Sequence, residues 1–313
     1  MKQISLFRTR RPTQHFEWLN NDFGFFYTIK KHLLYYTTKY QTLELADTNE
    51  FGRVLLLDGI TQAAQYGECY YHEIMVHPAM CCHPAPQNIL VIGAGDGGVL
   101  KEVLKYSCVK SVELAELDKD VIEISKKYLK TIHKGSFNDS RVKINIVDGR
   151  EYIEKNPKRF DVVIMDMIDP FGPARYLYTK EFFYSVKKSF RTNNGIFVMH
   201  SESPVTRPKT FLSIHNTLKS AFEYVCPFYA YIHMYATLWS ITVSSDKINI
   251  KNFNKAFINQ KLKKCKIKGL YYYTGIIHEA SLATWPHLDR LLRKKSRILT
   301  DKHPTTPDKI IHK

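Results

Sequence analysis

Four segments of this chain place acidic residues directly after runs of apolar residues. In an open α/β sheet, ligands bind outside the carboxyl ends of the strands, so acids in these positions lie on one rim. Several carboxylates held close together are unfavourable unless a cation joins them. The sequence therefore predicts a site for a positively charged ligand. The acids are Asp96, Glu116 with Asp118, Asp148, and Asp166 with Asp169.

Each of these acids also has a simpler structural explanation. Asp96 and Asp148 precede predicted helices and could cap them. Asp169 precedes a proline and could belong to a turn. Glu116 could be an ordinary acid at the edge of a loop. Four acidic segments converging on one rim of a basic protein favour a binding site over four unrelated explanations.

The glycine-rich stretch Ile89–Gly98 reads ILVIGAGDGG, which predicts a buried strand, a tight turn and the start of a helix. This arrangement brings backbone N–H groups close to a ligand. Gly93–Gly98 also satisfies G-x-G-x-x-G, the pattern of NAD-binding proteins. Asp96, however, would repel a pyrophosphate. A sulfonium nucleoside such as S-adenosylmethionine has no phosphate and carries a positive charge, so it fits better, with Glu116 placed to bind the ribose.

The elements that must position these acids alternate between strand and helix from residue 87 onward. This alternation predicts an α/β fold with a doubly wound, mostly parallel sheet. The chain from 224 to 244 is expected to add a terminal antiparallel pair. The expected strands are Asn88–Ile92, Ser111–Leu117, Val142–Val147, Phe160–Met165, Gly195–His200, Tyr224–Ile232 and Leu238–Ser244; the expected helices are Gly98–Tyr106, Lys119–Leu129, Glu151–Glu154, Lys180–Phe190 and Lys209–Phe222.

The region before residue 69 has a different pattern, with short β-branched and aromatic runs separated by turn-prone residues. It predicts a small antiparallel β-domain at residues 1–68, followed by a helix at Tyr70–Cys82. The α/β catalytic domain is expected at 69–300. Residues 301–313 contain two prolines and are expected to form a disordered basic tail. The expected N-terminal strands are Gly24–Ile29, Leu33–Thr38, Thr42–Ala46 and Arg53–Leu57, with turns at Asn49–Gly52 and Asp58–Gly59.

Composition and charge narrow the class of protein. The six cysteines form no CxxC pair, and their scatter predicts free thiols, no metal site and a reducing, cytoplasmic location. The chain has no run of 18 apolar residues, which argues against a membrane span. Much of the net charge of +16 lies in two segments, Lys247–Lys268 and His287–Lys313. A solvated lysine-rich surface is the favoured interpretation, and binding to nucleic acid is the alternative.

Several motifs in combination resemble the polyamine aminopropyltransferases of the spermidine synthase family, over about residues 15–285. The resemblance implies an N-terminal β-domain before a Rossmann-like domain of the methyltransferase type. It implies transfer of an aminopropyl group from decarboxylated S-adenosylmethionine to putrescine, giving spermidine and 5′-methylthioadenosine. The nucleoside is then a co-substrate, and neither cofactor nor metal is needed. The motifs are Leu57–Gln62, Tyr71–Glu73, Gly93–Gly98, Glu116–Asp118, Asp148–Gly149, Asp166–Pro173 and Tyr272–Leu282.

The same resemblance assigns roles to individual residues. Asp166 matches the proton acceptor. Positions that hold the amines and the aminopropyl chain are matched by Tyr71, His72, Asp96, Asp169 and Tyr235. Positions that contact the nucleoside are matched by Gln41, Gln62, Gly93, Glu116, Asp148, Gly149 and Pro173. The β-domain implies a homodimer or a homotetramer.

The chain departs from the family pattern near the amine site. Met167 and Ile168 replace small or hydroxylated residues, and Ile232–Trp239 replaces a proline-rich stretch. These departures leave the acceptor open: spermidine (giving spermine or thermospermine), agmatine and cadaverine are alternatives to putrescine. A small-molecule methyltransferase is an alternative of another reaction class, although it would need a partner for the methionine carboxylate.

Overall fold

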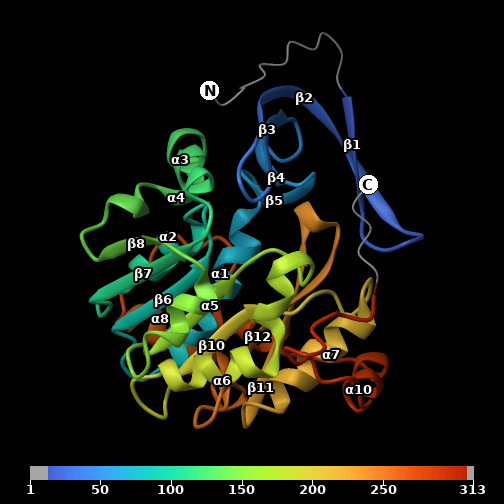
Figure 1. Ribbon diagram of the computed structural model, residues 1–313. Helices are drawn as coiled ribbons and strands as arrows, with labels where there is room; N and C mark the ends of the chain where they lie inside the picture. Colours follow the sequence, from blue (N-terminus) through green and yellow to red (C-terminus); the bar gives the residue numbers. More distant parts are fainter. Residues whose placement is uncertain (1–12, 309–313) are drawn as a thin grey trace.

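Residues 13–308 are described by the computed structural model, and they form two sheets from consecutive parts of the chain. In the first sheet the strands follow the order β1-β2-β3-β4-β5, and each neighbouring pair is antiparallel. Figure 1 shows this sheet in blue at the top of the molecule, next to the larger α/β body. Its strands are β1 (Thr13–Trp18), β2 (Gly24–Thr37), β3 (Thr42–Thr48), β4 (Arg53–Leu57) and β5 (Ile60–Ala64).

The second sheet has the strand order β11-β12-β10-β9-β6-β7-β8. Its strands from β10 to β8 are parallel, whereas β12 and β11 are antiparallel to their neighbours. The predicted fold class, a Rossmann-like sheet behind a small antiparallel β-domain, is confirmed. The strands are β6 (Asn88–Gly93), β7 (Ser111–Glu116), β8 (Val142–Ile146), β9 (Val162–Asp166), β10 (Ile196–His200), β11 (Tyr224–Ile232) and β12 (Thr237–Ser245).

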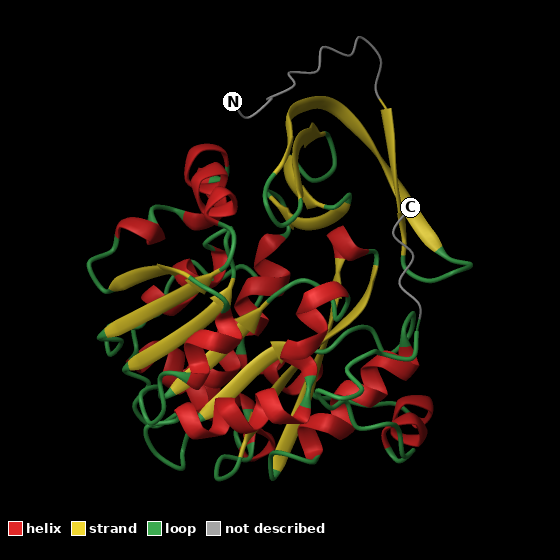
Figure 2. Cartoon of the chain, viewed as in Figure 1, coloured by secondary structure: helices red, strands yellow, loops and turns green. Residues whose placement is uncertain are grey.

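Helices cover both faces of the second sheet, as Figure 2 shows. Side chains alternate along β6: Ile89 and Val91 pack with α1 and α2, whereas Leu90 and Ile92 pack with α5, α6 and α7. No helix within residues 13–308 is both long and apolar enough to cross a membrane. The helices are α1 (Glu68–Cys82), α2 (Gly98–Leu104), α3 (Lys119–Tyr128), α4 (Lys130–His133), α5 (Gly149–Glu154), α6 (Lys180–Ser189), α7 (Pro208–Lys219), α8 (Lys255–Lys264), α9 (Gly275–Ser281) and α10 (Pro286–Leu292).

Strand register brings the loops that carry the acids to one edge. Gly93 at the end of β6 pairs with Asp166 at the end of β9, and Ile92 pairs with Ala115 of β7. The three strands therefore end side by side, and the loops that follow them share the rim predicted from the sequence.

The N-terminal sheet differs from the prediction in two ways. Strand β2 is continuous over Gly24–Thr37, where two separate strands were expected. Register shifts against β3 between Ile29 and Lys31 and between His32 and Leu34 mark irregularities that let one strand change direction. Strand β1 was not predicted as an element; four of the six residues of Thr13–Trp18 are exposed, so its sequence lacks the apolar alternation of a half-buried strand.

The expectation of a disordered tail is wrong for residues 301–308. Asp301 accepts hydrogen bonds from both terminal nitrogens of Arg150 (2.8 and 2.6 Å) and from the Thr179 hydroxyl (2.7 Å). Asp308 accepts from the backbone N–H of Thr210 at the start of α7 (2.8 Å). These partners are 98 or more positions away in sequence, so local composition does not reveal them. Residues 309–313 lie outside the described part of the chain.

Substituting Asp301 tests whether the C-terminal segment stabilises the fold. Asp301→Asn is expected to lower the Tm by roughly 2–4 °C, because a bidentate but partly exposed ion pair contributes up to about 1 kcal/mol. Differential scanning calorimetry measures the change. Glu151→Gln is the matched control: it also removes a carboxylate from a pair, with Lys155, but both side chains are more than half exposed. Equal Tm values for Asp301→Asn and the wild type would contradict the assignment.

Candidate active site

A cavity of about 640 Å³ lies between the N-terminal sheet and the carboxyl ends of the parallel strands. All six acids predicted to share a rim line this cavity, from Asp96 to Asp169. Gln41, Gln62, Tyr71, His72, Gly93, Pro173 and Tyr235 line it as well. The structure thus brings together predicted site residues that are up to 194 positions apart in sequence, from Gln41 to Tyr235.

Asp166 is the last residue of β9 and lies beside the glycine-rich loop. Its backbone carbonyl accepts a hydrogen bond from the N–H of Ala94 (2.8 Å). Gly93 has φ 78°, and a Cβ there would come within 2.1 Å of the Asp166 carbonyl oxygen. A side chain at position 93 would therefore push the loop away from Asp166.

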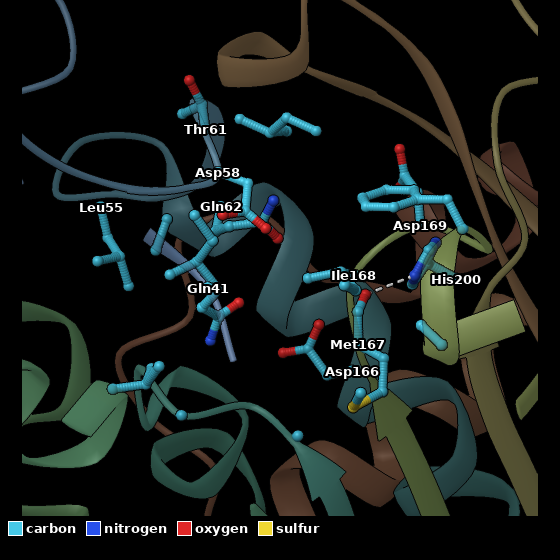
Figure 3. Close-up of a pocket in the computed structure, with 18 of the residues that line it drawn as sticks. Gln41, Leu55, Asp58, Thr61, Gln62, Asp166, Met167, Ile168, Asp169 and His200 are labelled. Atoms are coloured by element: carbon cyan, nitrogen blue, oxygen red, sulfur yellow. Dashed lines mark hydrogen bonds between the residues drawn. The ribbon is translucent and has the colours of Figure 1, made fainter. Parts of the chain in front are cut away.

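The carboxyl group of Asp166 is partly buried and points into the cavity, on the side where Gln41 and Gln62 lie (Figure 3). The Tyr71 hydroxyl donates a hydrogen bond to its Oδ1 (2.7 Å). Burial and the nearby charge of Asp96 raise the pKa of Asp166 to about 6, although His72 and the Tyr71 hydroxyl act in the opposite direction. This carboxylate is therefore ionised near neutral pH but takes up a proton more readily than an ordinary aspartate.

Asp96 is held by a buried imidazole rather than left free. His72 Nε2 lies 3.3 Å from Asp96 Oδ2, and its Nδ1 lies 2.6 Å from Glu68 Oε2. Burial disfavours a charged imidazole, but the two carboxylates outweigh burial and raise the pKa of His72 well above its usual value. Lys101 also contacts Glu68. His72 is therefore a cation between two anions, and it keeps Asp96 ionised.

The glycine loop makes room for this imidazole. A Cβ at position 98 would meet the His72 ring at 2.2–2.5 Å, so only glycine lets the ring reach Asp96. The N–H of Gly98 also donates to Asp96 Oδ1 (2.7 Å). Asp96 therefore accepts a hydrogen bond from the first turn of α2 and also lines the cavity. A role at the start of the helix and a role in ligand binding are thus compatible.

A second group of polar side chains lies at the ends of β7 and β8. Glu116 is partly buried, and desolvation raises its pKa to about 7, although the N–H of Asp118 donates to Oε1 (2.9 Å). Asp118 accepts from Gln41 Nε2 (3.1 Å), which ties the N-terminal sheet to the start of α3. Asp148 accepts from two N–H groups at the start of α5, so it caps a helix and lines the cavity.

Gly149 was predicted to contact the nucleoside, but it does not line the cavity. A Cβ at this position would meet Ile92 Cγ2 at 2.3 Å, so the glycine permits close packing of α5 on β6. The structure therefore assigns Gly149 to the support of the site rather than to its surface.

Asp169 faces the cavity but is already paired. Arg207 Nη1 lies 2.5 Å from Asp169 Oδ2 and 3.1 Å from the buried carboxylate of Glu202. The sequence analysis did not identify Arg207, because it follows Asp169 by 38 positions and no motif marks it. Glu17 of β1, which also lines the cavity, was missed as well.

Aromatic residues complete the wall near Asp166. Tyr235 packs against Tyr71 with ring centroids 5.9 Å apart and against Trp239 at 5.1 Å, and its hydroxyl donates to the Gln62 carbonyl (3.2 Å). His200 contacts the Met167 carbonyl through Nε2 (2.7 Å), as Figure 3 shows. This contact with the backbone helps to hold Met167 and Ile168, the bulky residues after Asp166, in place.

Comparison with known proteins agrees with this geometry. A family model described as the spermine/spermidine synthase domain matches residues 68–268, which is more than half of the chain. The chain belongs to the spermine/spermidine synthase family. A second model, the spermidine synthase tetramerisation domain, matches residues 14–65 and supports assembly into an oligomer.

Curated members of the family align over nearly their whole length. The polyamine aminopropyltransferase of Sulfurisphaera tokodaii is 34% identical over 292 residues, covering 93% of this chain and 96% of the relative. That of Thermococcus onnurineus is 36% identical over 278 residues, covering 89% and 96%. These matches identify the chain as a polyamine aminopropyltransferase.

Solved structures of family members have the same fold. A spermidine synthase in complex with the transition-state analogue AdoDATO superposes with a TM-score of 0.85 at 32% identity, covering 92% of this chain and 98% of that one. Spermidine synthase from Thermotoga maritima gives a TM-score of 0.83, also at 32% identity, covering 92% and 97%.

Removing the Tyr71 hydroxyl tests the electrostatics of this aminopropyltransferase site. In protein with ¹³C-labelled aspartate, the Asp166 carboxyl is expected to titrate near pH 6. Tyr71→Phe should raise that midpoint by about one unit, because it removes a hydrogen bond to the charged form. Tyr235→Phe is the control, since its hydroxyl bonds a backbone carbonyl and not Asp166. A midpoint that stays or falls in Tyr71→Phe would refute the assigned contact.

Proposed function

We propose that this protein transfers the aminopropyl group of decarboxylated S-adenosylmethionine to putrescine, giving spermidine and 5′-methylthioadenosine. The observation that carries the proposal is Asp166, a partly buried carboxylate of raised pKa that lines the cavity, where Asp96 and Asp169 are already paired with cations. Support also comes from the relatives named polyamine aminopropyltransferase and from the neighbour bound to a transition-state analogue.

Asp166 acts as the general base in this proposal. A primary amine has a pKa of about 10, so the acceptor arrives protonated and must lose a proton before its nitrogen can attack carbon. Asp166 takes that proton. The nitrogen then forms a bond to the propyl carbon that is attached to sulfur. The bond between that carbon and sulfur breaks, and sulfur keeps the electron pair. Positive charge moves from sulfur to nitrogen, and the neighbouring carboxylates stabilise it along the path.

The cavity also offers a place for the nucleoside. Glu116 binds the ribose hydroxyls, Asp148 lies on the adenine side, and Gln41, Gln62, Gly93 and Pro173 complete the contacts. Tyr71, His72, Asp96, Asp169 and Tyr235 belong to the amine and aminopropyl side. His72 acts through Asp96, because its two ring nitrogens face carboxylates.

Other features of the site argue against a methyltransferase. Such an enzyme needs a free cation for the methionine carboxylate of its co-substrate. Within residues 13–308, the arginines that line the cavity are Arg150 and Arg207, and each is paired with two acids. We further propose a homodimer or homotetramer with no metal or cofactor; this assembly and the cytoplasmic location stay predictions.

Purified protein incubated with decarboxylated S-adenosylmethionine and a panel of amines tests the reaction. The panel contains putrescine, cadaverine, agmatine and spermidine, and mass spectrometry identifies the products. Spermidine formed from putrescine, with 5′-methylthioadenosine in equal amount, is expected. Products from spermidine alone would replace putrescine as the acceptor, and the absence of any aminopropylated amine would refute the proposal.

Asp166→Asn tests the base. It should lower kcat by roughly 10²–10⁴-fold, the usual contribution of a general base, because an amide cannot accept the proton. Calorimetric binding of 5′-methylthioadenosine should persist, since Asp166 belongs to the amine side. Turnover at the wild-type rate would remove Asp166 from this role, and loss of nucleoside binding as well would indicate a structural one.

A further inference from the structure

The charge on the His72 ring affects Asp166, the proposed base. Burial and the charge of Asp96 raise the pKa of Asp166 to about 6, and the cationic His72 acts in the opposite direction. Burial on its own would favour a neutral imidazole. A neutral His72 would leave more of Asp166 protonated at neutral pH, and a protonated carboxyl group cannot accept the proton of the amine. The reaction therefore depends on the group that keeps His72 charged.

Two carboxylates contact the His72 ring, one at each nitrogen. Nε2 lies 3.3 Å from Asp96 Oδ2, whereas Nδ1 lies 2.6 Å from Glu68 Oε2. Charge-assisted hydrogen bonds are normally about 2.7–2.9 Å long, so the contact with Glu68 is the stronger one. Asp96 also lines the cavity, where the ammonium group of a substrate competes with His72 for it, but Glu68 is not among the described residues that line the cavity. Glu68 is therefore the partner that His72 keeps when a substrate is bound.

Glu68 is itself held in place by a cation on its other oxygen. Lys101 of α2 donates to Oε1, while His72 uses Oε2. Burial alone would raise the pKa of Glu68, but the hydrogen bonds and charges of His72 and Lys101 outweigh burial and lower it. Glu68 thus stays ionised, and each of its oxygens has a partner of its own.

The backbone places Glu68 and His72 for this contact. They are four positions apart on α1, so their side chains lie on the same face of the helix. Glu68 belongs to the first turn of α1, where the helix dipole favours a negative charge. Gly98 leaves the space that the ring occupies on the other side. The ring is therefore confined between two acids, and rotating it would break both contacts.

We infer that Glu68 is a positioning residue for the transfer reaction, which holds the His72 ring against Asp96 and keeps it a cation. This inference rests on the proposed function and extends it to a residue that touches neither substrate. The charged and titratable groups around the ring, directly or through one neighbour, are Glu68 and Tyr71 of α1, Asp96 of the glycine loop, Lys101 of α2, Asp166 of β9, and His133 of α4 beyond Asp96.

Nuclear magnetic resonance of full-length protein with ¹⁵N-labelled histidines measures the charge of His72 without any substrate. In the wild type both ring nitrogens are expected to be protonated at pH 7, with the signal assigned by its loss in His72→Gln. Glu68→Gln keeps the shape of the side chain and removes its charge. It should lower the pH at which His72 titrates by roughly 1–3 units, the usual effect of one close opposite charge. A neutral ring in the wild type at pH 7 would overturn the inference, and that measurement needs no folded variant.

The pH dependence of kcat/KM with putrescine shows whether this charge reaches the reaction. Glu68→Gln should move the acidic limb of the profile to higher pH by about one unit, because a neutral His72 no longer favours ionised Asp166. Glu102→Gln is the matched control: Glu102 is a buried acid that also contacts Lys101, but its imidazole partner is His77. This control should leave the acidic limb in place.

Two outcomes of the kinetic experiment would overturn the inference. A lower Tm in Glu68→Gln with an unchanged acidic limb would mean that Glu68 only joins α1 to α2. An equal shift in Glu102→Gln would mean that any lost carboxylate near Lys101 has the same effect. If the wild type forms no aminopropylated product, the proposed function fails, whereas the titration of His72 still decides whether Glu68 controls the ring.

Discussion

The structure depends on compensating the charges of several carboxylates that line one cavity. Each buried carboxylate costs several kcal/mol unless a cation or hydrogen-bond donors compensate it. Here His72 compensates Asp96, and Arg207 compensates Asp169. Arg207 also contacts Glu202, although burial still raises the pKa of Glu202 to about 8. Among the described residues, Asp166 receives one hydroxyl and no cation in direct contact, and its pKa is raised. The pKa of Glu116, which has no cation partner among these residues either, is raised as well. The chemistry of the site follows from this unequal compensation.

Helix α1 supplies several of the side chains that contact these charged groups. Glu68, Tyr71 and His72 lie on its first turns and reach Lys101, Asp166 and Asp96, respectively. One residue further, the buried Glu73 accepts hydrogen bonds from three consecutive backbone N–H groups at Tyr271–Tyr273. The helix thus faces the cavity with one set of side chains and anchors the C-terminal part of the chain with the next.

Much of this arrangement could be predicted from the sequence, because strand ends in a parallel sheet converge whatever the details of packing. The rim of acids and the glycine loop are of this kind. The pairing of Asp169 could not be predicted, since Arg207 reaches it only through the fold. The same holds for Asp301 with Arg150, at a separation of 151 residues, and for the continuity of β2. The close packing of Gly149 on Ile92 could not be predicted either, because the Asp148–Gly149 motif does not say whether a glycine faces a ligand or a neighbouring strand.

The strongly basic surface and the acidic cavity are compatible because they act over different distances. Lys247–Lys268 carries eight lysines, and none of them lines the cavity or makes an ion pair with a described acid. Charges on such a surface are screened within about 8–10 Å at ordinary salt concentrations. Carboxylates inside the cavity are screened much less, so a cation that has entered responds mainly to the acids that line it. A protein with a net charge of +16 can therefore bind a polycation, provided that the acids lie inside and the lysines lie outside.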